Sequence, residues 1–141
     1  MVDHKKVLLT GAAGRVGTYL RERLVDKYQL SGTDRIPVDG FDSMTADLTN
    51  FDAILPAMEG KDTVVHLAAE PRHTPDIWWD LLLPDNIIAT ANVFEASRRG
   101  GVKRVIFFSR CTSQASMSGT NRGVRSRREN TGISTRMTCR W

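Results

Sequence analysis

The feature that most constrains this chain is a short apolar run followed by three evenly spaced glycines and an amphipathic segment. The run covers residues 7–9 and is too short for a helix, so it predicts a strand buried on both faces of a parallel sheet. Gly11, Gly14 and Gly17 follow at intervals of three, and apolar residues then recur every four positions through residue 24. A strand, a glycine turn and a helix in this order form the setting in which parallel sheets bind nucleotides.

The three glycines have the properties that a dinucleotide site requires. Gly11 permits the tight turn, Gly14 lets a pyrophosphate approach the backbone, and Gly17 lets the helix pack closely on the strand. The first N–H groups and the dipole of the helix then face the phosphates. An ordinary strand-to-helix turn is the alternative, whereas a P-loop is excluded because no Gly-Lys-Ser/Thr follows. The predicted cofactor contacts in this loop are Gly11, Ala13, Gly14, Arg15, Val16 and Gly17.

Residues 10–17, Thr-Gly-Ala-Ala-Gly-Arg-Val-Gly, resemble the fingerprint of extended short-chain dehydrogenases/reductases, the NAD-dependent epimerase/dehydratase family. The resemblance covers residues 5–109 and rests on five motifs in the family's order. It implies NAD(P) as cofactor and a sugar or sugar acid as substrate. Around residues 66–86 the chain looks most like uronate dehydrogenases and archaeal NAD-dependent glucose-6-phosphate dehydrogenases.

A second strand is predicted over residues 28–33, and it ends at Asp34. This acid lies 23 residues past Gly11, close to the separation of about 20 expected for the carboxylate that holds the adenosine ribose. Because a carboxylate repels a 2′-phosphate, NAD is favoured over NADP. Arg35 argues the other way, since a guanidinium binds phosphate well, and a solvated turn acid is the alternative interpretation of Asp34.

The third strand is expected over residues 43–46, and it leads into Asp47 and Leu48. In the family that the chain resembles, an Asp at this place contacts the adenine edge, and a helix-capping role is the compatible alternative. Asn50 or Thr49 is the expected cap of the following helix, which Pro56 should bend or shorten.

The fourth strand runs from residue 62 into the turn Leu67, Ala68 and Ala69, whose small side chains leave room for a ligand to cross the backbone. The sequence His-Leu-Ala-Ala again resembles the family, where this turn meets the ribose and phosphates of the cofactor. His66 itself is interpreted as a satisfied histidine at a strand end rather than as a general base.

The last elements with a recognisable pattern are a helix over residues 85–99 and a fifth strand over residues 102–109. Pro84 is expected to break the apolar pattern before this helix, and the preceding Trp78 and Trp79 are interpreted as core or subunit packing. Asn86 and Asn92 match the two asparagines of the family's Asn-x-x-Gly-Thr-x-Asn helix, so Asn86 joins the predicted cofactor contacts.

Charge and composition divide the chain at residue 109. Residues 1–109 hold 13 Lys and Arg against 15 Asp and Glu, whereas residues 110–141 hold seven Arg and one Glu. We expect residues 1–109 to form the NAD(P)-binding domain and residues 110–141 to be a disordered or frame-shifted tail, because the tail has no sustained apolar period. Nucleic acid is not expected as a partner, since no aromatic platform accompanies the arginines.

The catalytic motif of the family that the chain resembles, Tyr-x-x-x-Lys, is absent from the sequence. Tyr19 and Tyr28 are its only tyrosines, and no lysine follows Lys103. Two hypotheses follow. The chain is either the cofactor half of a sugar oxidoreductase or epimerase, or a non-catalytic dinucleotide-binding module. No metal is expected, because the two cysteines, Cys111 and Cys139, lie outside any ligand spacing. No long apolar run or signal-like segment is seen, so a cytoplasmic protein without membrane contact is expected.

The predicted fold is α/β, a Rossmann-type doubly wound parallel sheet of about five strands in the order 3-2-1-4-5 with helices on both faces. The alternation of strands and helices predicts right-handed crossovers. The fifth strand would be an exposed apolar edge, and such an edge invites pairing with another chain. Self-association is therefore expected.

Overall fold

The computed structural model describes residues 4–72, 74–109 and 136–140, and their core is a six-stranded sheet in the order β3-β2-β1-β4-β5-β6. Five strands run parallel, which confirms the predicted parallel sheet and its order 3-2-1-4-5. The strands are β1 (Lys6–Thr10), β2 (Gln29–Asp34), β3 (Ser43–Thr45), β4 (Thr63–His66), β5 (Arg104–Phe108) and β6 (Arg136–Arg140).

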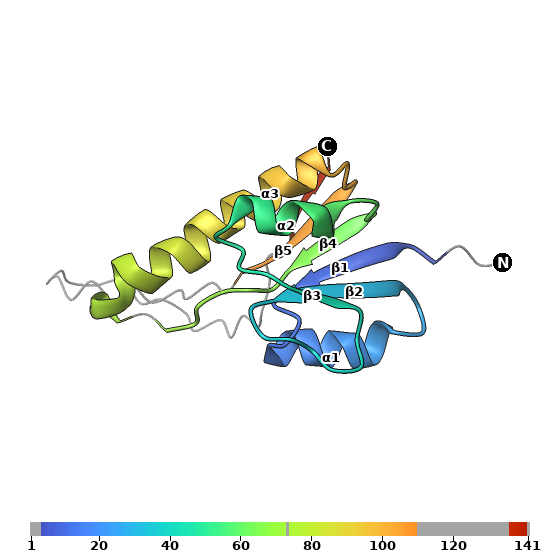
Figure 1. Cartoon of the computed structure of the whole chain (residues 1–141), viewed down its shortest axis with the longest axis horizontal. Coiled ribbons are helices and arrows are strands. Elements are labelled where there is room, and N and C mark those ends of the chain that lie inside the picture. Colours follow the sequence, from blue (N-terminus) through green and yellow to red (C-terminus); the bar gives the residue numbers. More distant parts are fainter. Residues whose placement is uncertain (1–3, 73, 110–135, 141) are drawn as a thin grey trace, which may run out of the picture.

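Helices cover both faces of this sheet. In Figure 1, α1 lies on one face while α2 and α3 lie side by side on the other. The helical elements are α1 (Arg15–Leu24), α2 (Phe51–Met58), the 3-10 turn η1 (Pro75–Ile77), the π-helical η2 (Trp78–Ile88) and α3 (Ala89–Arg99). Asn50 caps α2, because its side chain accepts a hydrogen bond from the Ala53 N–H.

Two apolar layers, one on each face of the sheet, hold the helices in place. Along β1, Leu8 packs toward α2 and α3 with Val64 and Val105, while Val7 and Leu9 pack toward α1. Successive side chains of a strand point to opposite faces, so an unbroken apolar run is what a strand covered on both sides needs. The residues that predicted the first strand are therefore the ones that join the two layers.

The chain from residue 78 to residue 99 is helical throughout, which corrects the expected break at Pro84. Residues 78–88 have π-helical geometry, and the Ala89 N–H bonds to the Pro84 carbonyl five residues earlier. Pro84 cannot donate a backbone hydrogen bond, and a wider turn spares its ring the clash that an α-helix would impose. This helical arm extends past the sheet in Figure 1, so Trp78 and Trp79 are 54% and 73% exposed rather than in the core.

The strand β6 lies antiparallel to β5, with Arg104 opposite Arg140 and Phe108 opposite Arg136. The prediction that β5 is an open edge is therefore wrong, and the expected self-association through it loses its basis. Five residues of the predicted tail, 136–140, belong to the sheet, whereas residues 110–135 and 141 lie outside the described residues.

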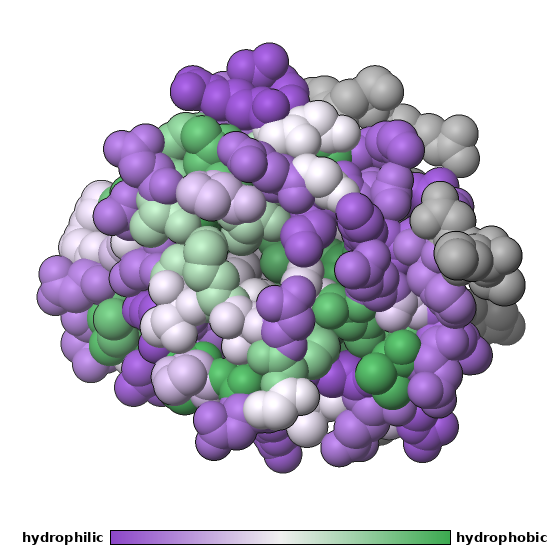
Figure 2. Space-filling model, turned by 45° about the vertical axis from the view of Figure 1, so that its right-hand side comes forward, coloured by the Kyte–Doolittle hydropathy of each residue, from purple (hydrophilic) through white to green (hydrophobic). Residues whose placement is uncertain are grey.

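The face in Figure 2 is largely hydrophilic, with several small hydrophobic patches between the polar side chains. Scattered apolar exposure of this kind is ordinary on protein surfaces. Within the described part of the chain, no helix is both long and apolar enough to pass through a membrane. The same residues hold no group of three His, Cys, Asp or Glu side chains suited to a metal ion.

Candidate functional site

The loop between β1 and α1 needs glycine at positions 11 and 17 for its own backbone conformation and close packing, whether or not a ligand is bound. Gly11 has a φ of +70°, and a Cβ there would lie 2.8 Å from the backbone of Ala68. A Cβ on Gly17 would lie 2.4 Å from the Gly11 carbonyl oxygen. The Gly11 N–H also donates to the Thr33 carbonyl of β2 at 2.9 Å. These contacts draw β1, β2, α1 and the turn after β4 together at one point.

Gly14 has a different environment from the other two glycines. A Cβ on it would meet a single neighbouring atom, the Gly11 carbonyl oxygen at 3.2 Å, and the residue lines a cleft. As the N-cap of α1, Gly14 supplies no side chain to the first turn, which also contains no acidic residue. The positive end of the helix dipole is thus left available to an anion from outside the loop.

The Asp34 carboxylate is tied to the glycine loop. Its Oδ2 accepts a hydrogen bond from the Ala13 N–H at 2.9 Å, and its Oδ1 accepts one from the Ile36 N–H at 3.2 Å. Each carboxylate oxygen can accept a second bond, so acceptor capacity remains for a ligand. The alternative of a merely solvated turn acid does not describe this residue, which is half-buried and faces the cleft.

The cleft itself lies at the carboxyl ends of the strands, where doubly wound sheets bind their ligands, and its volume is about 180 Å³. Eight of the thirteen predicted contact residues line it, and their role in cofactor binding stays a prediction. The eight are Gly11, Gly14, Asp34, Asp47, Leu48, Leu67, Ala68 and Ala69. Ala13, Arg15, Val16 and Gly17 are not in the lining; they form the loop and the first turn of α1 beside it.

Asp47 organises the turn between β3 and α2. Its Oδ1 accepts hydrogen bonds from the backbone N–H and from the hydroxyl of Thr49, both at 2.8 Å. The backbone hydrogen bond from Thr49 is the main cause that holds the pKa of Asp47 below its ordinary value. From α3, the Asn92 amide donates to the carbonyls of Leu48 and Thr49, and so fixes this turn at the edge of the cleft.

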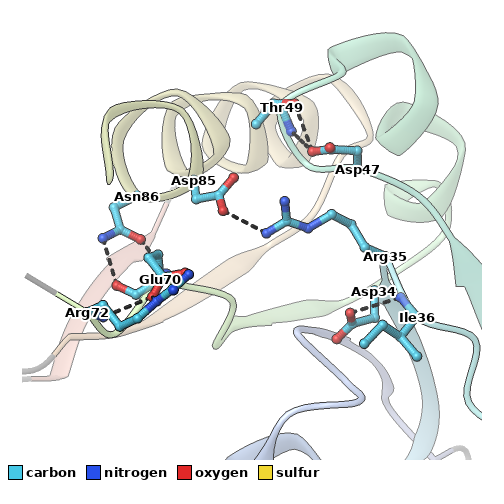
Figure 3. Close-up of polar contacts among 9 residues, drawn as sticks. All are labelled: Asp34, Arg35, Ile36, Asp47, Thr49, Glu70, Arg72, Asp85 and Asn86. Carbon is cyan, nitrogen blue, oxygen red and sulfur yellow. Dashed lines mark hydrogen bonds and ion pairs between the residues drawn. The ribbon is translucent and has the colours of Figure 1, made fainter. Parts of the chain in front are cut away.

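Asn86 binds the loop after β4 and is not part of the cleft lining. Its Oδ1 accepts from the Glu70 N–H at 2.7 Å, and its Nδ2 donates to the Glu70 carbonyl at 3.1 Å (Figure 3). The Glu70 side chain accepts from Arg72, and this hydrogen bonding lowers the pKa of Glu70 to about 2. Asn86 therefore locks the loop that follows Ala69 onto η2. Its contact with the cofactor stays a prediction.

An ion pair that the sequence did not reveal crosses the cleft. Arg35 Nη2, just past β2, lies 2.7 Å from Oδ2 of Asp85 on η2, and both residues belong to the lining (Figure 3). The hydrogen bond to Asp85 is the main cause that raises the pKa of Arg35 above its ordinary value. Ala46 and Ala89 also line the cleft without having been predicted, and their small size was the only available signal.

His66 is held in place by its neighbours, as the sequence predicted for a satisfied histidine at a strand end. Its Nδ1 lies 2.6 Å from Thr10 Oγ1, its Nε2 lies 3.0 Å from Thr90 Oγ1, and its ring stacks on Phe107. The side chain is fully buried, and burial lowers its pKa to about 4. The neutral ring joins β1, β4 and α3 directly behind the turn at Leu67.

A doubly wound sheet with a glycine loop, an uncapped helix start and an acid after its second strand defines a Rossmann-type dinucleotide-binding domain. The chain belongs to the NAD dependent epimerase/dehydratase family, whose model matches residues 7–132. The family resemblance inferred from the motifs is thereby confirmed, and the predicted cofactor, NAD, agrees with the family's description.

Similar proteins include several sugar and sugar-acid dehydrogenases. The L-arabinose 1-dehydrogenase (NAD(P)(+)) of Haloferax volcanii is 38% identical over 104 residues, which are 74% of this chain and 40% of that protein. A uronate dehydrogenase of Pseudomonas putida is 37% identical over 110 residues, which are again 74% of this chain and 40% of that protein. The chain therefore spans about 40% of the length of these curated relatives.

Solved structures show the same likeness. The crystal structure of uronate dehydrogenase from Agrobacterium tumefaciens has a TM-score of 0.66 and 34% identity, and it covers 74% of this chain and 40% of that one. A mutant of that enzyme was solved complexed with NAD and matches with the same TM-score. The resemblance to uronate dehydrogenases, inferred from the region around residues 66–86, agrees with these relatives.

Proposed function

We propose that this chain binds NAD in the cleft and forms the cofactor-binding part of an oxidoreductase acting on a sugar or sugar acid. The observation that carries the proposal is the Asp34 carboxylate, which is hydrogen-bonded to the glycine loop while it faces the cleft. In this arrangement Asp34 receives the ribose hydroxyls, and the start of α1 beside Gly14 receives the pyrophosphate. The cytoplasm remains the predicted location.

The residues of this chain bind and orient the cofactor. Bound NAD supplies a nicotinamide that accepts or donates a hydride. Small side chains at Ala68 and Ala69 keep the turn after β4 open to a ligand, and the Asn86 bonds to Glu70 hold the loop that follows. His66 takes no part in proton transfer, because it is buried behind the turn.

Catalysis needs a proton-transferring group, and the described part of the chain places no tyrosine in the cleft lining. In the family, a tyrosine of a Tyr-x-x-x-Lys motif exchanges the hydroxyl proton, and this sequence has no such motif. Tyr19 lies exposed on α1. Tyr28 comes just before β2, at the amino ends of the strands, whereas the cleft lies at their carboxyl ends. We expect no NADH formation from a panel of uronates and sugar phosphates, and steady turnover in that assay would contradict this expectation.

Replacing Asp34 by Ala should weaken NAD binding roughly tenfold or more, because charge-assisted hydrogen bonds are worth about 1.5–3 kcal/mol. The same change should narrow the preference for NAD over NADP, since the carboxylate no longer repels a 2′-phosphate. Isothermal titration calorimetry with both cofactors measures the two effects.

Two further variants separate the causes in this experiment. Asp34→Asn keeps an acceptor for the Ala13 N–H but loses the charge, so it tests ribose binding with the glycine loop still tied. Asp39→Ala removes the same charge from an exposed position outside the cleft lining and should bind NAD as the wild type does. Failure of the wild type to bind NAD would refute the proposed function.

A further inference from the structure

Arg35 and Asp85 reach the cleft from opposite sides. Arg35 follows Asp34 at the end of β2, and Asp85 comes from η2, 50 residues later in the chain. The Arg35 side chain is 57% exposed, whereas that of Asp85 is 10% exposed. The largely exposed arginine thus spans the cleft to a nearly buried carboxylate, and Figure 3 shows its side chain pointing at Asp85.

The guanidinium of Arg35 lies within a set of three carboxylates. Asp34, Asp47 and Asp85 all favour its charged form, with Asp85 as its hydrogen-bond partner and the other two acting through charge. In Figure 3, Asp34 and Asp47 flank the arginine while its end points at Asp85. One donor of the fork, Nη2, is already bonded to Asp85. The guanidinium next to Asp34 in the chain is therefore already paired with Asp85 before a ligand arrives.

NADP differs from NAD by a phosphate on the 2′-oxygen of the adenosine ribose, the oxygen that a carboxylate at Asp34 would bind. A guanidinium directly after that carboxylate is well suited to bind such a phosphate by two parallel hydrogen bonds, but only if its fork can turn toward the ribose. Asp85 occupies Nη2 and turns the arginine away from Asp34 toward η2.

We propose that Asp85 is a positioning residue for coenzyme specificity. Its ion pair holds the Arg35 side chain across the cleft, and so prevents the guanidinium from binding the 2′-phosphate of NADP. The inference rests on the proposed function, since it assumes that Asp34 receives the adenosine ribose. It extends that function by assigning the choice between NAD and NADP to two elements, the end of β2 and η2, rather than to Asp34 alone.

Replacing Asp85 by Ser tests the proposal, because a serine side chain is too short to take over the hydrogen bond from Arg35. The variant should bind NADP about tenfold more tightly than the wild type, the gain expected from one charge-assisted hydrogen bond, while its NAD affinity changes less than about threefold. Dissociation constants for both cofactors, measured by calorimetry on the intact chain, give the ratio that a purely structural role would leave unchanged.

Two more variants complete a double-mutant cycle. In the Arg35→Gln background, Asp85→Ser should no longer favour NADP, because the effect acts through the guanidinium. Glu95→Gln, which removes one negative charge from α3 outside the cleft lining, should leave the NADP/NAD ratio as it is in the wild type. Thermal melts accompany each variant, since Arg35→Gln alone leaves the nearly buried Asp85 without its partner.

The outcomes are distinct. A selective gain in NADP binding that disappears in the Arg35→Gln background supports the positioning role. A gain that persists in that background assigns the effect to direct repulsion by Asp85 and overturns it, as do equal changes for the two cofactors. If the wild type binds neither cofactor, the proposed function fails and this inference fails with it.

Discussion

A chain in which Gly14 is replaced by Val is expected to fold and to show no NAD binding by calorimetry. A Cβ at this position meets only the Gly11 carbonyl oxygen, at 3.2 Å, so the fold should accommodate it after a small adjustment. The added side chain projects from the N-cap of α1, a residue of the cleft lining, where a pyrophosphate has to approach the helix start. Binding should therefore be lost even though the circular dichroism spectrum and the thermal melt stay close to those of the wild type.

Gly17→Ala provides the contrast that isolates this effect. Its Cβ would lie 2.4 Å from the Gly11 carbonyl oxygen and 2.7 Å from that of Ala12, both of them backbone atoms that cannot turn aside. Overpacking of this kind costs about 1–3 kcal/mol or more, so this single methyl group should lower the melting temperature markedly. If Gly14→Val bound NAD like the wild type, or if it unfolded as readily as Gly17→Ala, the assignment of Gly14 to the ligand would be refuted.

The sheet could be predicted because the signals for it are local. Residues 7–9 carry an apolar run that a strand between two helical layers needs, and Gly11 follows directly where the chain must turn. The order of the five parallel strands then follows from the doubly wound fold that a strand, a glycine turn and a helix indicate. None of this requires knowledge of which distant side chains meet.

The errors in the predicted fold come from interactions between distant or unusual segments. The pairing of β6 with β5 joins residues about thirty positions apart, and the Arg-rich composition of residues 136–140 gave no apolar pattern to suggest a strand. Pro84 was expected to break the apolar pattern before the helix over residues 85–99, because proline disrupts an α-helix, whereas the π-helical geometry of η2 accommodates it.

The candidate site also has features that the sequence could predict and features that it could not. Asp34 was found because its distance from Gly11 is set by one strand-helix-strand unit, a local property of the chain. Its hydrogen bond to the Ala13 N–H was not predicted, because it depends on the exact course of the glycine loop. The ion pair between Arg35 and Asp85 was not predicted either, because nothing in a single sequence links residues 50 positions apart. Asn86 matched a family position, but the sequence alone did not show that its amide binds the Glu70 backbone.

The stability of the protein is expected to fall as the pH is lowered from 6.5 toward 4, with His66 as a main cause. Burial lowers the pKa of His66 to about 4 in the folded chain, whereas an unfolded histidine titrates near 6.5. Between these values the unfolded chain binds a proton that the folded chain does not, so the free energy of unfolding rises with pH in this window. The contribution is fully present above pH 6.5, and its loss by pH 4 is on the order of 3 kcal/mol.

Urea unfolding at several pH values between 4 and 7 measures this dependence, and His66→Gln identifies its source. The variant should be less stable at pH 7, because it loses the stacking on Phe107 and strains the bonds to Thr10 and Thr90, but its stability should change much less with pH. Acidic side chains that titrate in this range are common to both proteins, so the difference between the two curves belongs to His66. His4→Gln makes the same replacement at an exposed histidine, which bonds to the Lys27 carbonyl, and is the matched control. Parallel curves for the wild type and His66→Gln would show that His66 does not titrate as a buried neutral ring.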